Sequence, residues 1–315
     1  MRLVFMGTPE FSVLSLEKLL TSNHQVLGVV TQPDRPKGRG MKLAHSPVKT
    51  TALAHNLPVF QPESLPEEEL MSFLNEVNPE AIVVVAYGLK IPPVLLNLPF
   101  YGCINLHASL LPKYRGASPI QAAILNGETT TGVTTMKMDE GWDTGDLLLT
   151  RTVPIGETET FGTLHDRLAE IGATILVETL DALEEGKVTP QPQNHSAATY
   201  VKKLTPDDYV LDWTGDTSSL YNRIRAFDPV PGARTSLNGK TLKVWAARLG
   251  EGWYGLEAAA PGTIGELVKG EEGGLPVRTG DGVLLLTELQ LPGKKRLPIQ
   301  QFAAGNDLSA GTVFE

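Results

Sequence analysis

The chain has 315 residues, which is longer than most single domains and long enough for two. Hydrophobic residues make up 41% and charged residues 20% of it, a balance that excludes an intrinsically disordered chain. The formal net charge of -9 excludes a polycation, so any nucleic-acid partner has to be held by a local basic patch. The single cysteine, Cys103, excludes an internal disulfide and a cysteine-based zinc cluster.

The first predicted element is a strand over residues 2–7, an apolar run that ends at Gly7. Thr8 is suited to be the N-cap of a following helix, and Pro9 is suited to its first position. We expect the buried face of that helix to include Phe11, Leu14, Leu19 and Leu20 or their neighbours.

Strands and helices then alternate through the first half of the chain. Further strands are predicted over 25–31, 57–60, 81–88, 102–109, 131–138 and 146–155. Helices are predicted over 66–79, 117–127 and 160–186. This order predicts an α/β fold with a Rossmann-like, open and mostly parallel sheet that carries helices on both faces. The last strands can run antiparallel.

A change in composition and in hydrophobic pattern near residue 190 predicts a second domain. Residues 190–206 contain several prolines and no periodicity, which is typical of a linker. From 207 to 315, one helix and several short strands separated by Gly and Pro predict a small β-barrel of the oligonucleotide-binding (OB) type. We therefore expect a first domain over 1–189, a linker over 190–206 and an OB-like domain over 207–315.

No membrane segment or leader is visible. No apolar run approaches the roughly 20 residues of a membrane span, and Gly-Thr-Pro interrupts the N-terminal apolar stretch too early for a signal peptide. We expect a cytoplasmic protein with no membrane contact, working as a monomer.

Polar groups suited to catalysis gather at the predicted ends of two strands. Asn105 and His107 are two residues apart, so on a strand they point to the same side. An acidic loop over 139–146 contains Asp143 in a Thr-Gly turn. Because ligands bind outside the carboxyl ends of the strands in open parallel sheets, we expect both to reach one cleft. An amide, an imidazole and a carboxylate suit attack on a carbonyl-like carbon without a metal or a nucleophilic Ser or Cys.

Each of these residues also has a purely structural interpretation. A single strand histidine such as His107 is more often structural than catalytic, and an amide such as Asn105 commonly caps a loop. The acidic loop could be a solvated turn or a Mg²⁺ site, although the sequence has no phosphate-binding glycine motif. Cys103 has the strand context of a small core residue rather than of a nucleophile.

A long segment favours the catalytic interpretation of these residues over the structural one, through its resemblance to a known family. Residues 104–149, from INLHASLLP to DEGWDTGDLLL, resemble the core of the 10-formyltetrahydrofolate-dependent formyltransferases. Asn105, the histidine of the H-x-S-L-L-P segment (His107) and the aspartate of the D-x-G-x-D-T-G-D loop (Asp143) match the catalytic set of that family. Further segments, among them VVTQPDRPKGRGMKLAHSPVK and IRAFDPVPGA, resemble the members that formylate methionyl initiator tRNA.

The resemblance implies a reaction and its co-substrate. The amino group of methionine on initiator tRNA would attack the formyl carbon of 10-formyltetrahydrofolate, with no metal, in translation initiation. Asn105 and His107 would stabilise the oxyanion, and Asp143 would position His107 and help to remove the amine proton. The resemblance, with the position of the loops at the sheet edge, implies that tetrahydrofolate contacts Ser109, Leu110, Leu111, Pro112, Tyr87, Gly88, Leu89, Asp139, Gly141 and Asp146.

A basic stretch over 34–49 is the predicted tRNA contact. It holds five basic residues and one acidic residue, a net charge of +4 in a protein of -9, and its Gly and Pro content predicts a loop. The second domain, over 206–315, has a net charge of -3, so only clustered cations could bind tRNA there. The predicted tRNA-binding residues are Arg35, Lys37, Arg39, Lys42, Lys202, Lys203, Arg223, Lys294 and Lys295. A solvated loop with incidental charge is the alternative.

Two other functions stay open at this point. A sugar-nucleotide N-formyltransferase would share the catalytic set, but the basic stretch and the RAFDPVPG segment disfavour it. A non-enzymatic RNA-binding or folate-binding protein would have no need for Asn105, His107 and Asp143 together.

Overall fold

The computed structural model describes residues 1–37 and 42–315, so Arg39, one of the predicted tRNA-binding residues, lies outside the described residues. The chain divides into two compact units. The first comprises 1–119, 131–154 and 165–201, and the second comprises 120–130, 155–164 and 202–315. The predicted boundaries at residues 189 and 206 stay a prediction.

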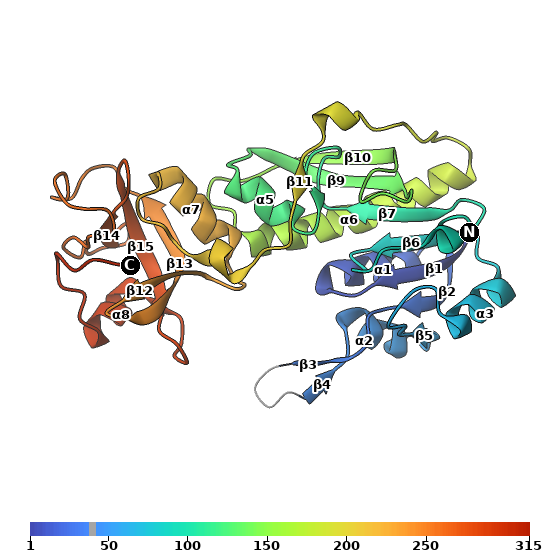
Figure 1. Ribbon diagram of the computed structural model, residues 1–315, viewed down its shortest axis with the longest axis horizontal. Helices are drawn as coiled ribbons and strands as arrows, with labels where there is room; N and C mark the ends of the chain where they lie inside the picture. The colour runs from blue at the N-terminus through green and yellow to red at the C-terminus, as the bar shows by residue number, and fades with distance from the viewer. Residues whose placement is uncertain (38–41) are drawn as a thin grey trace. The chain divides into compact units, whose positions relative to one another are not determined.

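The first unit is built on a seven-stranded sheet with the order β10-β9-β7-β6-β1-β2-β5 (Figure 1). The strands from β7 to β5 pair in parallel, and β9 pairs antiparallel to β7. The predicted α/β class with a mostly parallel sheet is therefore confirmed. The strand bounds are β1 Arg2–Gly7, β2 Gln25–Val30, β5 Val59–Phe60, β6 Ala81–Val85, β7 Cys103–His107, β9 Thr130–Lys137 and β10 Asp146–Pro154.

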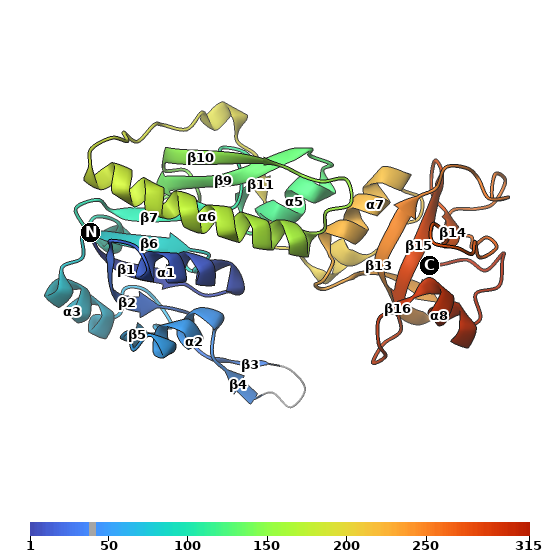
Figure 2. The same cartoon turned by 180° about the vertical axis from the view of Figure 1, so that it is seen from behind.

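Helices cover both faces of this sheet because its strands are apolar on both sides. On one face, Val4, Ile82 and Cys103 share a core with leucines of α3 and α4. On the other face, α6 runs along the sheet (Figure 2), with Gly172 placed against the side chain of Leu106. The helices are η1 Glu10–Ser12, α1 Val13–Leu20, α2 Pro47–Ala54, α3 Glu68–Val77, α4 Pro93–Leu96, α5 Pro119–Leu125 and α6 Phe161–Glu184.

The start of the first helix differs from the prediction. Thr8 does not cap it; its Oγ1 instead donates to the backbone oxygen of Tyr87 at 3.1 Å, and Pro9 is the N-cap of η1. Leu14 is 37% exposed, whereas Leu16 is fully buried. Directly before α1 the chain forms the short 3₁₀ helix η1, whose tighter turn alters which residues face the core.

The described residues of the basic stretch form two paired strands and the start of a helix rather than a simple loop. Strands β3 (Arg35–Lys37) and β4 (Lys42–Ala44) form an antiparallel hairpin, and α2 begins at Pro47 directly after it. Ser46 is the N-cap of α2 and accepts a hydrogen bond from the backbone nitrogen of Lys49 at 3.0 Å.

The second unit is a small β domain with a core of its own, as predicted. Its five strands pair antiparallel in the order β12-β13-β15-β14, with β16 beside β15. Leu220 and Ile224 of α7 and Phe302 of α8 fill the core together with alternating strand residues. The bounds are α7 Thr217–Ala226, β12 Ala233–Leu237, β13 Lys240–Leu249, β14 Leu275–Arg278, β15 Val283–Gln290, β16 Leu297–Pro298 and α8 Ile299–Gly305.

Short elements complete the described chain. Strand β8 (Arg115–Gly116) pairs in parallel with β11 (Tyr200–Val201), so part of the predicted linker lies along the first unit. Two short helices, η2 (His195–Ala197) and η3 (Pro206–Tyr209), flank β11. No helix of the described residues is long and apolar enough to cross a membrane.

Candidate active site

Strand β7 carries two of the three predicted catalytic residues on one side. Asn105 pairs with Val84 of β6 and Met136 of β9, and His107 pairs with Thr134 of β9. Each is 7% exposed, so both are nearly buried at the end of a central strand. Since both lie in β7 and are two residues apart, Asn105 and His107 point to the same face of the sheet.

The environment of His107 fixes the proton on one of its ring nitrogens. Nε2 lies 3.0 Å from the backbone oxygen of Tyr114. Because a carbonyl oxygen can only accept, Nε2 has to carry a proton and donate it. Nδ1 is left as the nitrogen that exchanges protons, and it lies 3.6 Å from Oδ2 of Asp143. This distance allows an ion pair when His107 is protonated but is too long for a good hydrogen bond.

Asp143 reaches this position from the predicted acidic loop. Its Oδ2 accepts a hydrogen bond from the backbone nitrogen of Gly116 at 2.8 Å. Its φ of 54° lies in the left-handed region that non-glycine residues seldom adopt. Gly116 itself has a φ of 116°, and a Cβ there would lie 2.2 Å from the backbone oxygen of Val201. Only glycine fits at that donor position.

The side-chain amide of Asn105 is free to serve a ligand. Among the described residues, no hydrogen bond is made by its side chain, although the residue is nearly buried. A buried amide without a protein partner is costly unless water or a ligand satisfies it. Its nearness along β7 to His107 makes it a suitable donor to a developing oxyanion.

Cys103, two residues before Asn105 on the same strand, takes no part in this arrangement. Its side chain is fully buried, and its Sγ donates to the backbone oxygen of Leu95 at 3.5 Å. Burial raises the pKa of this thiol to about 12, so it stays protonated and is a poor nucleophile.

The predicted folate-binding residues surround this site in sequence but differ in exposure. Ser109 is buried, and its Oγ donates to the backbone oxygen of Lys113 at 2.7 Å. The Tyr87 ring is 2% exposed within the apolar core, and burial raises its pKa to about 12. A folate contact through the Tyr87 ring therefore requires the ring to move.

The other predicted folate positions are more accessible. Gly88, Asp139 and Gly141 are exposed, whereas Leu111 is buried. Oδ1 of Asp139 accepts hydrogen bonds from the backbone nitrogen of Gly141 at 3.0 Å and from Oγ1 of Thr144 at 2.6 Å. Asp139 thus shapes the loop that carries Asp143. Partial exposure is shared by Leu89, Leu110, Pro112 and Asp146.

The predicted tRNA-binding residues are divided between the two units. In the first, Arg35 is exposed in β3, and Lys37 and Lys42 stand at the other end of the hairpin. In the second, Arg223 donates to the backbone oxygen of Val210 at 2.7 Å, which gives it a structural role. The other predicted residues of the second unit, Lys202, Lys203, Lys294 and Lys295, are all exposed.

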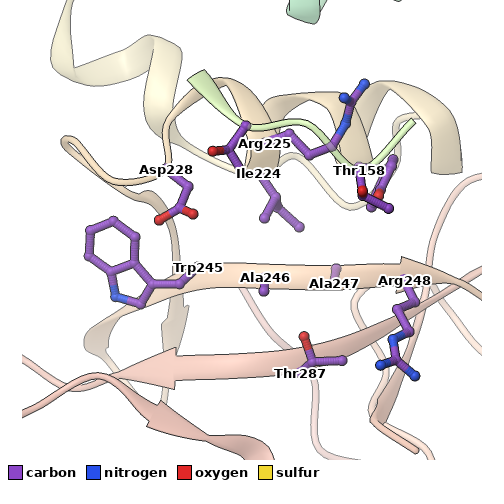
Figure 3. A pocket seen from close by; sticks show the side chains of 11 residues that line it. Thr158, Ile224, Arg225, Asp228, Trp245, Ala246, Ala247, Arg248 and Thr287 are labelled. Carbon is purple, nitrogen blue, oxygen red and sulfur yellow. The ribbon is translucent and has the colours of Figure 1, made fainter. Parts of the chain in front are cut away.

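A cavity of about 240 Å³ lies within the second unit (Figure 3). Its wall is formed by α7, β13, β15 and a turn at residues 158–160, and Trp245 and Arg248 of β13 line it. Arg225, also on its wall, donates to the backbone oxygens of Gly156 and Glu159. None of the predicted folate-binding residues lines this cavity.

One other cluster of the described residues could in geometry hold a cation. His24, Asp181 and Glu184 place their ligand atoms within 4.8 Å of one another. The N-terminal ammonium of Met1 already lies there, 3.1 Å from Nδ1 of His24 and 3.3 Å from Oε1 of Glu184. This ammonium supplies the positive charge that the two carboxylates attract.

Sequence reasoning missed the residues that hold the three predicted catalytic groups in place. Tyr114 accepts the His107 proton, Gly116 donates to Asp143, and Gln193 donates to the backbone oxygen of Asp143 at 2.9 Å. The Arg-Gly pair at 115–116 is a usable signal, since a glycine in a non-repetitive segment marks a special backbone position. Gln193 lies in an irregular segment and gives no signal.

Comparison with known proteins assigns both parts of the chain. Residues 1–180 match the family model described as formyl transferase, and residues 203–307 match that of the formyl transferase C-terminal domain. The fold and the site thus define a two-part formyl transferase.

Curated relatives cover nearly the whole chain. One from Pelobacter propionicus is 48% identical over 99% of this chain and 95% of its own length, and one from Caldanaerobacter subterraneus subsp. tengcongensis is 47% identical over 100% of both. Both are named methionyl-tRNA formyltransferase. The chain belongs to the methionyl-tRNA formyltransferase family.

Solved structures agree on the fold. A methionyl-tRNA formyltransferase from Clostridium thermocellum has a TM-score of 0.54 at 17% identity, covering 89% of this chain and all of that one. HypX from Aquifex aeolicus, in complex with tetrahydrofolic acid, has a TM-score of 0.64 at 21% identity, covering 96% of this chain and 46% of that one.

Proposed function

We propose that this protein transfers the formyl group of 10-formyltetrahydrofolate to the amino group of methionyl initiator tRNA. Full-length identity of 47–48% to curated methionyl-tRNA formyltransferases is the observation that carries the proposal. The site supports it, because Asn105, His107 and Asp143 lie at the end of β7 and on the loop after β9 as an acyl-transfer site requires.

The first step is attack of the methionine amine on the formyl carbon, which makes a tetrahedral intermediate with a negatively charged oxygen. The free amide of Asn105 donates to this oxygen. His107, protonated on Nδ1, is the second donor, and Asp143 at 3.6 Å stabilises the imidazolium. No step requires a metal or a covalent enzyme intermediate.

The proton balance assigns the remaining work to Asp143 and His107. The attacking amine loses one proton as its new C–N bond forms, and N10 of tetrahydrofolate gains one as the old C–N bond breaks. The net reaction releases no proton, so one proton has to travel from amine to N10. Asp143, fixed by Gly116, accepts it directly or through water, and Nδ1 of His107 can relay it.

The folate and the tRNA take different parts of the molecule in this proposal. Tetrahydrofolate lies beside residues 87–89, 109–112 and 139–146, with pterin contacts made mainly by backbone groups. The acceptor end of the tRNA meets the β3–β4 hairpin, and the exposed lysines of the second unit contact its phosphates. We also propose that the chain acts as a monomer in the cytoplasm, where translation initiation takes place.

The second candidate is transfer to an amino sugar on a nucleotide. A sugar 3N-formyltransferase, WlaRD, shares the fold with a TM-score of 0.65 at 19% identity, which carries no argument about substrate. Identity to the curated methionyl-tRNA formyltransferases is more than twice as high and extends over the whole chain.

A direct assay separates the two candidates. Purified protein is given 10-formyltetrahydrofolate with either methionyl initiator tRNA or a panel of amino-sugar nucleotides, and formylated product is measured. We expect turnover with the tRNA alone. Formylation of an amino-sugar nucleotide at equal or higher kcat/KM would replace the proposed function by the second candidate. Uncharged initiator tRNA is the control for acceptor chemistry.

A further inference from the structure

The first unit contains a buried guanidinium that has no acidic partner in the part of the chain that the structure describes. Arg115 is fully buried, and no ion pair joins it to a carboxylate among the described residues. Its hydrogen bonds go to neutral groups: Oε1 of Gln193, the hydroxyl of Tyr200 and Nδ1 of His195. Burying a charge in this way costs free energy, which packing alone does not explain.

Arg115 determines which way the Gln193 amide faces. Nε and Nη2 of Arg115 lie 3.2 and 2.7 Å from Oε1 of Gln193. A guanidinium can only donate, so the amide oxygen has to face it and the NH₂ group has to point away. Gln193 is 5% exposed, so water does not compete for this orientation.

The NH₂ group of Gln193 in turn holds the loop that carries Asp143. It donates to the backbone oxygen of Asp143 at 2.9 Å and to that of Gly145 at 2.7 Å. Asp143 has a φ of 54°, a strained conformation that persists only when its surroundings impose it. Gly145 is equally constrained, since a Cβ there would lie 2.0 Å from the backbone oxygen of Lys137.

The same segment holds the other side of the site. Thr199 Oγ1 accepts a hydrogen bond from the backbone nitrogen of Tyr114 at 2.8 Å. Tyr114 has a φ of 60°, and its oxygen accepts the Nε2 proton of His107. Gln193 and Thr199 therefore bond to the backbone of Asp143 and of Tyr114, and Tyr114 in turn holds the His107 ring.

We propose that Gln193 is a positioning residue for Asp143, with its amide oriented by the buried guanidinium of Arg115. The inference rests on the proposed catalytic role of Asp143. Gln193 contacts no substrate and acts by holding the Asp143 carboxylate at a fixed distance from Nδ1 of His107. Loss of its hydrogen bonds to the backbone oxygens of Asp143 and Gly145 lets the loop relax from the left-handed conformation and moves the carboxylate.

The test compares Gln193→Glu with Gln191→Glu. The first keeps the shape and the contact to Arg115 but replaces the donor by a carboxylate oxygen that repels both backbone oxygens. Gln191 is exposed in the same segment and its side chain donates only to the backbone oxygen of Thr189, so its variant is the matched control. Initial rates are measured with 10-formyltetrahydrofolate and methionyl initiator tRNA, per mole of protein shown to be folded by near-ultraviolet circular dichroism.

We expect Gln193→Glu to lower kcat by about 10- to 100-fold, the usual effect of a catalytic group misplaced by about 1 Å. Both KM values should stay within about threefold of wild type, because no substrate contact is lost. Arg115→Lys, which keeps the charge but loses the fork of donors to Oε1, should lower kcat in the same direction without changing either KM. Gln191→Glu should match wild type.

Two outcomes would overturn the proposal. One is a Gln193→Glu kcat within twofold of the Gln191→Glu value. The other is a rise of both KM values in step with the fall of kcat, which indicates general loss of structure. An Asp143→Asn variant run in parallel separates this inference from the proposed function. Wild-type turnover in Asp143→Asn refutes the catalytic role itself, whereas inactive Asp143→Asn beside fully active Gln193→Glu refutes only the positioning role.

Discussion

Each ring nitrogen of His107 faces a different partner, so the two nitrogens have different roles in proton transfer. Nε2 is committed as a donor to the backbone oxygen of Tyr114, so only Nδ1 can gain or lose a proton. Nδ1 faces Asp143, whose carboxylate is held by Gly116 rather than by His107 itself. The carboxylate therefore keeps its place whether or not His107 is protonated, and it is available to the amine proton.

At the same scale, the free amide of Asn105 leads to a prediction. Asn105→Ala removes one oxyanion donor and should lower kcat by about 100- to 1,000-fold, with little change in either KM. The melting temperature should change little, since the amide has no partner among the described residues. Formyl transfer is measured at saturating substrates. Asn97→Ala, at an exposed position after α4, is the control, and near-wild-type turnover in Asn105→Ala would contradict the assignment.

Among the helices and strands, local sequence rules predicted the elements with a periodic pattern. They missed the features that depend on hydrogen bonds between residues distant in sequence. Period-two patterning located β7 and placed Asn105 and His107 on one side. The Thr8 cap failed because partners distant in sequence occupy its hydroxyl, which donates to the backbone oxygen of Tyr87 and accepts from the backbone nitrogen of Gln32 at 3.4 Å. The orienting role of Gln193 was invisible because it depends on Arg115, 78 residues away. Predicted contacts with folate and tRNA stay predictions.

One carboxylate, that of Asp34, joins the two ends of the β3–β4 hairpin to the rest of the first unit. Asp34 accepts hydrogen bonds from Lys49, His45 and Gln61 at 2.7–2.9 Å. The hydrogen bond from Lys49 is the largest cause that lowers the Asp34 pKa to about 2. Lys49 is thereby neutralised, so the basic stretch carries less free charge than its composition indicates.

Asp34→Asn should loosen the hairpin base and raise KM for methionyl-tRNA by about tenfold, with KM for 10-formyltetrahydrofolate unchanged. Because the folded pKa lies below the ordinary value of 3.8, Asp34 stabilises the fold above that pH and loses this effect as the pH falls through about 2. The KM effect should therefore be constant between pH 6 and 8. Glu63→Gln, at an exposed carboxylate two residues after Gln61, is the control; an equal rise of both KM values would argue against a hairpin effect.

At the scale of the whole molecule, the question is how a protein of net charge -9 binds a polyanion. Several cations of the second unit are already committed. Arg296 pairs with Asp228 and Glu288 and lies over the Trp245 ring, and Arg225 is bonded to backbone oxygens. Lys294 and Lys295, by contrast, are exposed and have no acidic partner among the described residues. Exposed, uncommitted lysines are the ones that can release counterions from tRNA.

The salt dependence of tRNA binding tests this division of the cations. Each phosphate contact contributes about 0.7–0.9 to the slope of log affinity against log salt concentration, so Lys294→Ala with Lys295→Ala should reduce the slope by about 1–2. Lys187→Ala removes an exposed lysine that is paired with Glu185 and should leave the slope unchanged. Affinity for the tRNA is measured by fluorescence titration between 50 and about 300 mM salt, the range over which counterion release dominates. Equal slopes for the double variant and wild type would show that these two lysines do not contact phosphates, and the electrostatic attraction would then have to come from the basic hairpin and from other exposed lysines such as Lys202 and Lys203.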